Sequence, residues 1–165
     1  MATTIQLPDR PVGYPATPGT NTTTAIGTAV TLIAAFKNVS SVATLKAILK
    51  TMHHLAYSPS ADTTFQFELV GNPTVTGGTW ATIPGSGLQI NTTATVSGGV
   101  SAMTTFGFAA TAQGNQPQTI SLSILEAEDA GLTLTIGQEF AIVANTHVAL
   151  STLEIMWSAH WVEID

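Results

Sequence analysis

The side chains that could do chemistry in this sequence are few and widely spaced. Its four histidines form one adjacent pair, His53 and His54, and two single residues, His147 and His160. Adjacent residues point to opposite faces if their segment is a strand, so this pair is a poor metal chelate. We interpret the histidines as surface or interface residues and expect no metal site.

The densest group of carboxylates is Glu126, Glu128 and Asp129, within Leu125–Gly131. On a strand, Glu126 and Glu128 would share one face, and paired carboxylates can hold calcium or hydrolyse glycosides. A solvated loop is the simpler interpretation of a short acidic run, and we prefer it. Glycan hydrolysis through this pair stays as the weakest functional alternative.

Motifs of enzymatic chemistry do not occur. The sequence contains no G-x-S-x-G, no G-x-x-x-x-G-K-[ST], no H-E-x-x-H and no D-x-D-x-D-G pattern. It has no cysteine, which excludes disulfides and thiolate-held zinc or iron–sulfur centres. We therefore predict a protein that is not an enzyme, with no catalytic residues and no cofactor.

Charge is scarce and unevenly placed. Only 8% of the 165 residues are charged, against about 25% in an average soluble domain. Residues 1–50 contain all four basic residues and one acid, a balance of +3, whereas residues 51–165 contain nine acids and no Lys or Arg, a balance of −9. Because nucleic-acid binding needs basic residues to neutralise phosphates, this distribution excludes it. The longest apolar run, Ala25–Phe36, is shorter than the roughly 20 residues of a membrane span, so we expect no membrane partner.

Hydroxyl side chains take the place of charge. The chain has 28 threonines and 11 serines. Threonine is β-branched and suits the half-exposed face of a strand, so the composition favours β structure. The length fits one domain, and a hydrophobic content of 44% argues against disorder.

Short apolar–polar alternations separated by Gly, Pro and Asn predict the strands. The alternation is cleanest in Phe65–Leu69, Ile120–Ile124 and Leu132–Ile136. The pattern predicts an all-β domain over residues 25–165, an antiparallel β-sandwich of the jelly-roll type. The candidate strands are Ala29–Lys37, Thr63–Val70, Thr79–Ile83, Leu88–Thr95, Met103–Ala110, Thr119–Glu126, Glu139–Asn145 and Thr152–Ile164.

One segment, Ser41–Leu55, fits two structures. Its apolar residues Val42, Leu45, Leu49 and Met52 have helical spacing, and alternate positions in the same segment are also apolar. Lys, Ala and Leu favour a helix. The surrounding β pattern favours a strand, which is our prediction.

Residues 1–24 contain four of the eight prolines and predict an extended arm outside the sandwich. A loose terminus and an arm docked on a neighbouring subunit both fit this composition. Because almost no lysine guards the predicted strand edges, we expect a homo-oligomer, most simply a trimer. The side chains that would make the docking contact are Ile5, Leu7, Arg10, Val12 and Tyr14.

Aromatic residues leave one further alternative. Trp157 and Trp161 share a face of the last predicted strand, and we expect both in the core. Exposed aromatic rings such as those of Tyr57, Trp80 or Trp157 would instead suit carbohydrate binding.

The stretch FQFELVGNPTVTGGTW, residues 65–80, resembles a family of tailed-bacteriophage virion structural proteins. These share a strand, an Asn-Pro-Thr turn and a Thr-Gly-Gly-Thr-Trp hairpin in succession. The strand Leu32–Ser40 and the closing strand Trp157–Ile164 are similar to the same family, and the resemblance covers roughly residues 29–164. It also favours a strand over Lys46–Tyr57.

The resemblance implies a β-sandwich virion component, made in the cytoplasm of a host bacterium. The function it favours is that of a capsid decoration (cement) protein, which bridges subunits of the major capsid protein or other virion proteins. The alternative is a tail or head fibre or tip protein whose β-sandwich binds host carbohydrate. The resemblance implies no catalytic or metal-binding residue.

Overall fold

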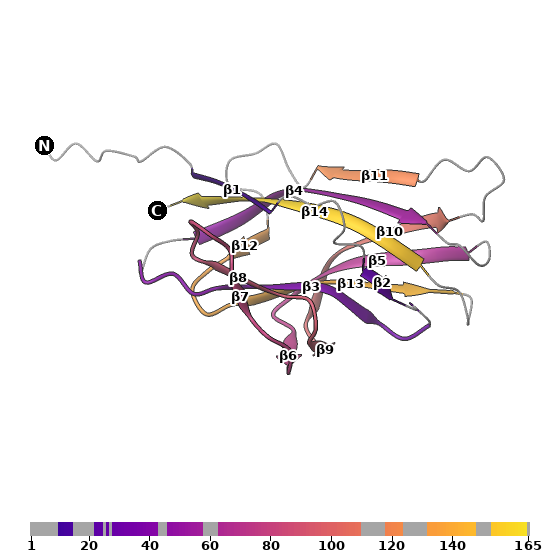
Figure 1. Ribbon diagram of the computed structural model, residues 1–165, viewed down its shortest axis with the longest axis horizontal. Helices are drawn as coiled ribbons and strands as arrows, with labels where there is room; N and C mark the ends of the chain where they lie inside the picture. Colours follow the sequence, from indigo (N-terminus) through magenta and orange to yellow (C-terminus); the bar gives the residue numbers. More distant parts are fainter. Residues whose placement is uncertain are drawn as a thin grey trace, which may run out of the picture.

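The computed structural model of the chain describes residues 10–14, 22–24, 26, 28–42, 46–57, 63–109, 118–123, 132–147 and 153–164. Within these ranges all regular structure is β-strand, and all strand pairs are antiparallel. This part of the chain contains no helix that could cross a membrane. The predicted all-β, antiparallel class is confirmed (Figure 1).

The described part of the chain forms fourteen strands, several of them very short. Their bounds are β1 Arg10–Tyr14, β2 Thr22–Thr24, β3 Thr31–Asn38, β4 Lys46–Tyr57, β5 Thr63–Gly71, β6 Thr74–Thr76, β7 Ala81–Thr82, β8 Leu88–Asn91, β9 Thr95–Ser97, β10 Val100–Ala109, β11 Gln118–Ser123, β12 Leu132–Leu134, β13 Glu139–Thr146 and β14 Leu153–Ile164.

Two six-stranded sheets carry the fold. In the first, which we call sheet A, the long strands β14 and β4 lie side by side; β1 and β2 pair with the outer edge of β14, and β11 and β12 with the outer edge of β4. In the second, sheet B, the order is β10-β5-β13-β3-β8-β7. Strands β6 and β9 form a separate two-stranded ribbon.

The two sheets lie face to face with the apolar core between them (Figure 1). Sheet A contributes Trp161, which is fully buried and lies against two rings of sheet B. Its ring centroid is 5.1 Å from that of Phe36 and 6.0 Å from that of Phe140. The predicted core position of Trp161 is confirmed, whereas the side chain of Trp157 lies outside the part that the structure describes.

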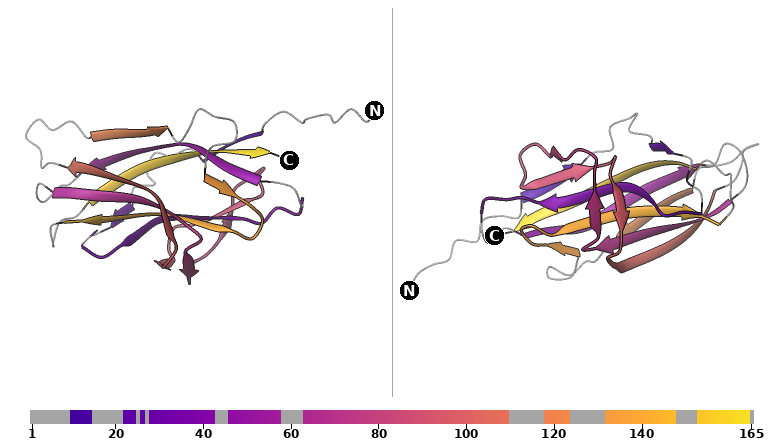
Figure 2. Two further views of the ribbon diagram at one scale, coloured as in Figure 1. Left: turned by 180° about the vertical axis from the view of Figure 1, so that it is seen from behind. Right: turned by 90° about the horizontal axis from the view of Figure 1, so that it is seen from below.

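Sheet B is also covered on its outer face. The β6–β9 ribbon lies across the sheet on the side away from sheet A (Figure 2, right). Burial on both faces explains why Leu32–Phe36 is buried without a break, as is typical of strands covered on two sides. The buried outer residues are Leu32, Ala35, Val70, Ala141 and Val143, and the residues packed over them are Val75, Trp80, Ala94 and Val96.

The ambiguous segment is a strand. Lys46–Tyr57 forms β4, with β14 paired along one edge and β11 and β12 along the other. The helical preference of its Lys, Ala and Leu residues is overridden because a central strand has its backbone hydrogen-bonding groups paired from both sides.

One predicted strand, Leu88–Thr95, is split into β8 and β9. The Oδ1 atom of buried Asn91 accepts hydrogen bonds from the backbone nitrogens of Thr93, at 3.0 Å, and Ala94, at 3.1 Å. This Asx turn redirects the chain out of sheet B and into the ribbon. Alternation alone could not reveal the break, because the turn depends on a side-chain hydrogen bond.

The Gly77-Gly78 turn does not close a hairpin between successive strands. Both glycines have positive φ, 74° and 66°. The strand before them, β6, pairs with β9 and not with β7, the strand that follows. The strands β7 and β8 therefore form an excursion at the edge of sheet B between the two strands of the ribbon.

Candidate interaction surface

The outer face of sheet B carries an ion pair beside an aromatic ring. Glu139 on β13 and Lys37 on β3 are direct cross-strand neighbours, and Lys37 Nζ lies 3.1 Å from Glu139 Oε1. The same Nζ lies 5.9 Å from the centroid of the Trp80 ring. A partly exposed ion pair contributes about 0–1 kcal/mol and a cation–π contact about 0.5–1 kcal/mol, so this cluster orders the surface more than it stabilises the fold.

Trp80 is not a freely exposed aromatic platform. Its side chain is half-buried and packs on the outer cluster of sheet B, and Lys37 approaches its ring. A sugar-binding ring needs an open face, so this arrangement counts against Trp80 as a carbohydrate site. The side chains of Tyr57 and Trp157, the other aromatic candidates, lie outside the described part of the structure.

Beside the ribbon, the outer face of sheet B is hollowed into an open groove of about 320 Å³. Its walls come from strands far apart in the sequence, because β5 and β13 of the sheet floor meet β9 and the segment before β3. Four of the lining side chains are valines and one is a carboxylate. The lining residues are Val30, Glu68, Val70, Val96, Ser97, Gly98, Gly99, Ser101 and Val143.

Glu68 gives this valine groove its polarity. It lies on β5, opposite Thr104 of β10 on one side and Val143 of β13 on the other, and is half-buried. No hydrogen bond or ion pair joins its carboxylate to another described residue.

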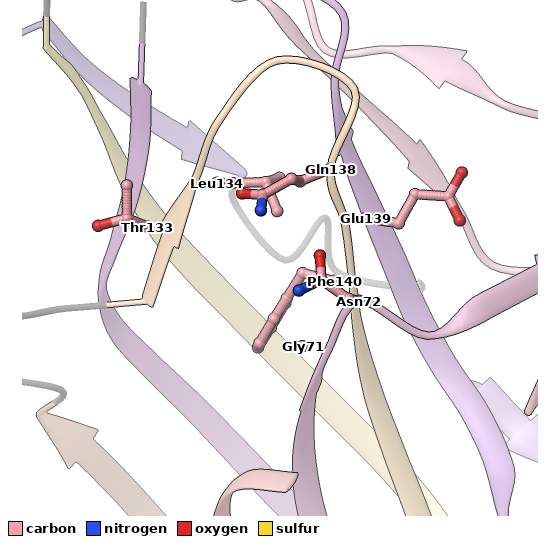
Figure 3. Close-up of a pocket in the computed structure, with 7 residues that line it drawn as sticks. All are labelled: Gly71, Asn72, Thr133, Leu134, Gln138, Glu139 and Phe140. Atoms are coloured by element: carbon pink, nitrogen blue, oxygen red, sulfur yellow. The ribbon is translucent and has the colours of Figure 1, made fainter. Parts of the chain in front are cut away.

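A smaller hollow of about 70 Å³ lies under the turn between β12 and β13 (Figure 3). Its polar groups are used within the fold: Asn72 N donates to Glu139 O at 3.0 Å, and Thr135 N donates to Gln138 Oε1 at 2.9 Å. The Glu139 side chain points away from Leu134. This hollow is far below the roughly 300 Å³ typical of ligand pockets, and we assign it a structural role.

Three buried polar side chains also have structural partners. Asn38 Nδ2 donates to Leu134 O at 2.9 Å, and Asn91 Nδ2 donates to Gly77 O at 3.1 Å. Glu163 is 5% exposed and accepts a hydrogen bond from a backbone nitrogen across the two sheets. All three residues serve as fixed hydrogen-bond anchors for turns.

The residues considered for metal binding or hydrolysis are only partly within the described chain. His53 and His54 lie in β4, where consecutive positions face opposite sides. Glu126, Glu128 and Asp129 lie outside the described residues. Among the described residues, no group of three or more His, Cys, Asp or Glu could hold a metal ion.

The predicted arm enters sheet A of its own chain at two points, β1 and β2, which pair with β14. Ile5 and Leu7 lie outside the described residues, and the docking of the arm on a neighbour stays a prediction. In the register of β1, the positions Arg10, Val12 and Tyr14 lie opposite Glu163, Trp161 and Ala159, whose side chains are all buried.

Sequence reasoning missed the valine groove. Alternation in Phe65–Leu69 does place Glu68 on the polar face of its strand, which is the one local signal available. Val30 and Val143 join it only through the pairing of β13 with β5 and β3. Comparison with known proteins adds nothing to this geometry: no family model matches the chain, and no curated protein matches it.

Proposed function

We propose that the protein is a non-enzymatic structural component of a bacteriophage particle, a capsid decoration (cement) protein that stabilises the head by bridging capsid subunits. The proposal combines the resemblance of residues 65–80 to virion structural proteins with the strand order of the two sheets. In this interpretation the protein acts passively, through contacts spread over a surface.

The strand order is the observation that carries the proposal. We count β1 with β2 as one interrupted strand, and β11 with β12 as another. We leave out the four strands β6, β7, β8 and β9. Eight strands then remain in chain order. The first then pairs with the eighth, the second with the seventh, the third with the sixth and the fourth with the fifth. This nested order supports the proposed jelly-roll sandwich, a fold used by viral capsid and lectin domains.

The surface chemistry supports the same role. A surface with 8% charged residues in the chain and 39 hydroxyl side chains has a smaller desolvation penalty against another protein than a charged surface has, provided that its hydroxyl groups find hydrogen-bond partners. A cement protein that binds the assembled shell and not free subunits stabilises the shell by mass action, and several weak contacts on one particle add as avidity.

The test is made on particles of the phage that encodes the chain. Heads assembled without the protein are expected to open at a lower temperature than complete heads, and added purified protein should restore the difference at hundreds of copies per head. Failure of the purified protein to bind such heads would overturn the proposal. A few copies per particle, all on the tail, would favour the fibre alternative.

The same fold keeps the carbohydrate-binding fibre or tip protein as second candidate, since lectin domains also adopt jelly rolls. The half-buried position of Trp80 under Lys37 weakens it. A glycan array tests this candidate against the cement protein, because saturable binding to a host glycan would favour the fibre or tip protein. If Trp80→Ala left that binding intact, the carbohydrate site would lie elsewhere on the molecule. No binding to any glycan would remove this candidate.

A further inference from the structure

The exposed apolar side chains of the described residues gather at two places. Val30 lines the valine groove, and Val100, 72% exposed, lies between two of its lining residues. Val39, Val42 and Ile136 are also exposed, and they lie in the β3–β4 and β12–β13 connections, at one end of the two sheets. We call this end the tip and define it as residues 39–42, 84–87 and 135–138.

The tip is built from three connections that are hydrogen-bonded to one another. Val39 N donates to Gly87 O at 2.8 Å, which joins the β3–β4 segment to the β7–β8 turn. Gly137 N donates to Asn38 O at 2.8 Å, which joins it to the β12–β13 turn. Figure 1 shows the three connections at the same end of the two sheets. Such a cross-linked surface is pre-organised, so little entropy is lost when it binds.

The tip itself contains no charged residue, but a lysine lies beside it. Lys46 begins β4 and is exposed, and the next residue, Ala47, pairs with Leu134 just before the turn that carries Ile136. The two described acids nearby are already engaged, since Glu139 pairs with Lys37 and Glu163 is buried against the N–H of Gly87. The tip therefore presents exposed valines and isoleucine beside one exposed ammonium group.

The valine groove has the complementary character. It is hollowed and lined by valines, and the carboxylate of Glu68 in it has no ion-pair partner among the described residues. The tip of the same chain cannot fill it, because Lys46 lies at the end of sheet A whereas the groove lies on the outer face of sheet B. Among the described residues the groove stays open, so a second molecule can reach it.

We propose that the tip of one copy docks in the valine groove of a second copy, with Lys46 facing Glu68. This inference rests on the proposed homo-oligomer and names its contact. Because tip and groove are different surfaces, the contact is heterologous. Such a contact closes into a ring when its rotation allows and otherwise forms a filament, and the expected trimer is the closed form.

A charge exchange tests the ion pair in the full-length protein. Lys46→Glu and Glu68→Lys are each expected to weaken self-association about tenfold or more, measured by analytical ultracentrifugation, because each places like charges in the contact. In a trimer, an equimolar mixture of the two single variants can restore at most two of the three contacts, whereas the double variant K46E/E68K should regain association close to wild type. Thr133→Lys, at an exposed position of sheet A, is the control and should associate like wild type.

Cross-linking tests the placement of the two copies. The chain has no cysteine, so a single introduced cysteine is the one thiol that a cross-linker can modify. A mixture of Val42→Cys and Ser97→Cys proteins, treated with a short bismaleimide, should give a dimer of one chain of each kind. A mixture of Val42→Cys and Thr133→Cys proteins should not.

The outcomes are decisive in both directions. A wild-type protein that is monomeric at all concentrations, a double variant that stays as weak as the single ones, or equal cross-linking with Thr133→Cys would each overturn the proposed contact. The particle-binding test is independent of these measurements. A ring that forms in solution but does not bind heads would overturn the cement function and leave the tip–groove contact standing.

Discussion

Glu163 on β14 of sheet A accepts a hydrogen bond, 2.5 Å long, from the backbone N–H of Gly87, in the turn that leads into β8 of sheet B. The two residues are 76 positions apart in the chain. The carboxylate is 5% exposed, so this bond joins the two layers at a point that water hardly reaches. It also fixes one of the three connections that make up the tip.

The first prediction concerns this bond. Glu163→Ala should lower the free energy of unfolding by about 1–3 kcal/mol in urea titrations, because it leaves the Gly87 N–H without its acceptor. Glu163→Gln keeps an acceptor oxygen and should lose less. Glu68→Gln is the matched control at a protein concentration where the chain is monomeric: its half-buried carboxylate has no described partner within the chain, so stability should stay within about 0.5 kcal/mol of wild type. Equal stability of Glu163→Ala and wild type would contradict the role assigned to the bond.

The second prediction uses two adjacent glycines with nearly the same backbone. Gly77 and Gly78 both have φ near +70°, so alanine is strained at either position by about 1–2 kcal/mol. A Cβ at Gly77 would meet nothing within 4 Å, whereas a Cβ at Gly78 would lie 2.5 Å from Asn91 Oδ1 and 2.6 Å from the backbone nitrogen of Ala94. Gly78→Ala should therefore destabilise the protein clearly more than Gly77→Ala.

Amide hydrogen exchange locates this effect. Gly78→Ala displaces the side chain that holds the Asx turn, so the amides of Thr93 and Ala94 should exchange faster than in Gly77→Ala. The same loss of stability for both alanine variants would mean that the Asn91 side chain can move away without loss of free energy. The Asx turn at Thr93 and Ala94 would then not depend on it.

Local pattern was sufficient to predict most strands. Alternation in Phe65–Leu69 and the turn residues after it correctly place β5. The side chains also face as expected, with Phe65 and Phe67 in the core and Glu68 on the other face. Period-two alternation carries this information because strand geometry fixes which face each residue takes.

Pairing and surface assembly could not be predicted from local pattern. Asn91 ends a strand through a side-chain hydrogen bond to residues that follow it, which composition does not reveal. Glu68 and Val143 meet in the valine groove although 75 positions separate them, because β13 inserts between β5 and β3. Long-range pairing of this kind is fixed by the whole fold and not by any segment.

The third prediction concerns the indole of Trp161. The ring is fully buried, and its Nε1–H has no hydrogen-bond partner among the residues that the structure describes. Trp161→Phe removes this unsatisfied donor together with part of the ring, whereas Phe36→Leu removes as many non-hydrogen atoms but no polar group. Since an unsatisfied buried donor costs about 1–3 kcal/mol, Trp161→Phe should destabilise the protein less than Phe36→Leu in the same urea titration. A larger loss for Trp161→Phe would show that the indole N–H is satisfied.

The fourth prediction concerns the surface cluster of Lys37, Glu139 and Trp80. A double-mutant cycle with Lys37→Met and Glu139→Gln should give a coupling energy of about 0.2–1 kcal/mol at low salt, since the two side chains are 33% and 21% exposed. The coupling should shrink at 1 M salt, where charges a few ångströms apart are screened. Lys37→Met keeps an aliphatic stem beside Trp80, so the ring should stay packed and the single variant should cost little. A coupling above about 2 kcal/mol that salt leaves unchanged would instead show that the pair contributes to stability as a buried ion pair does.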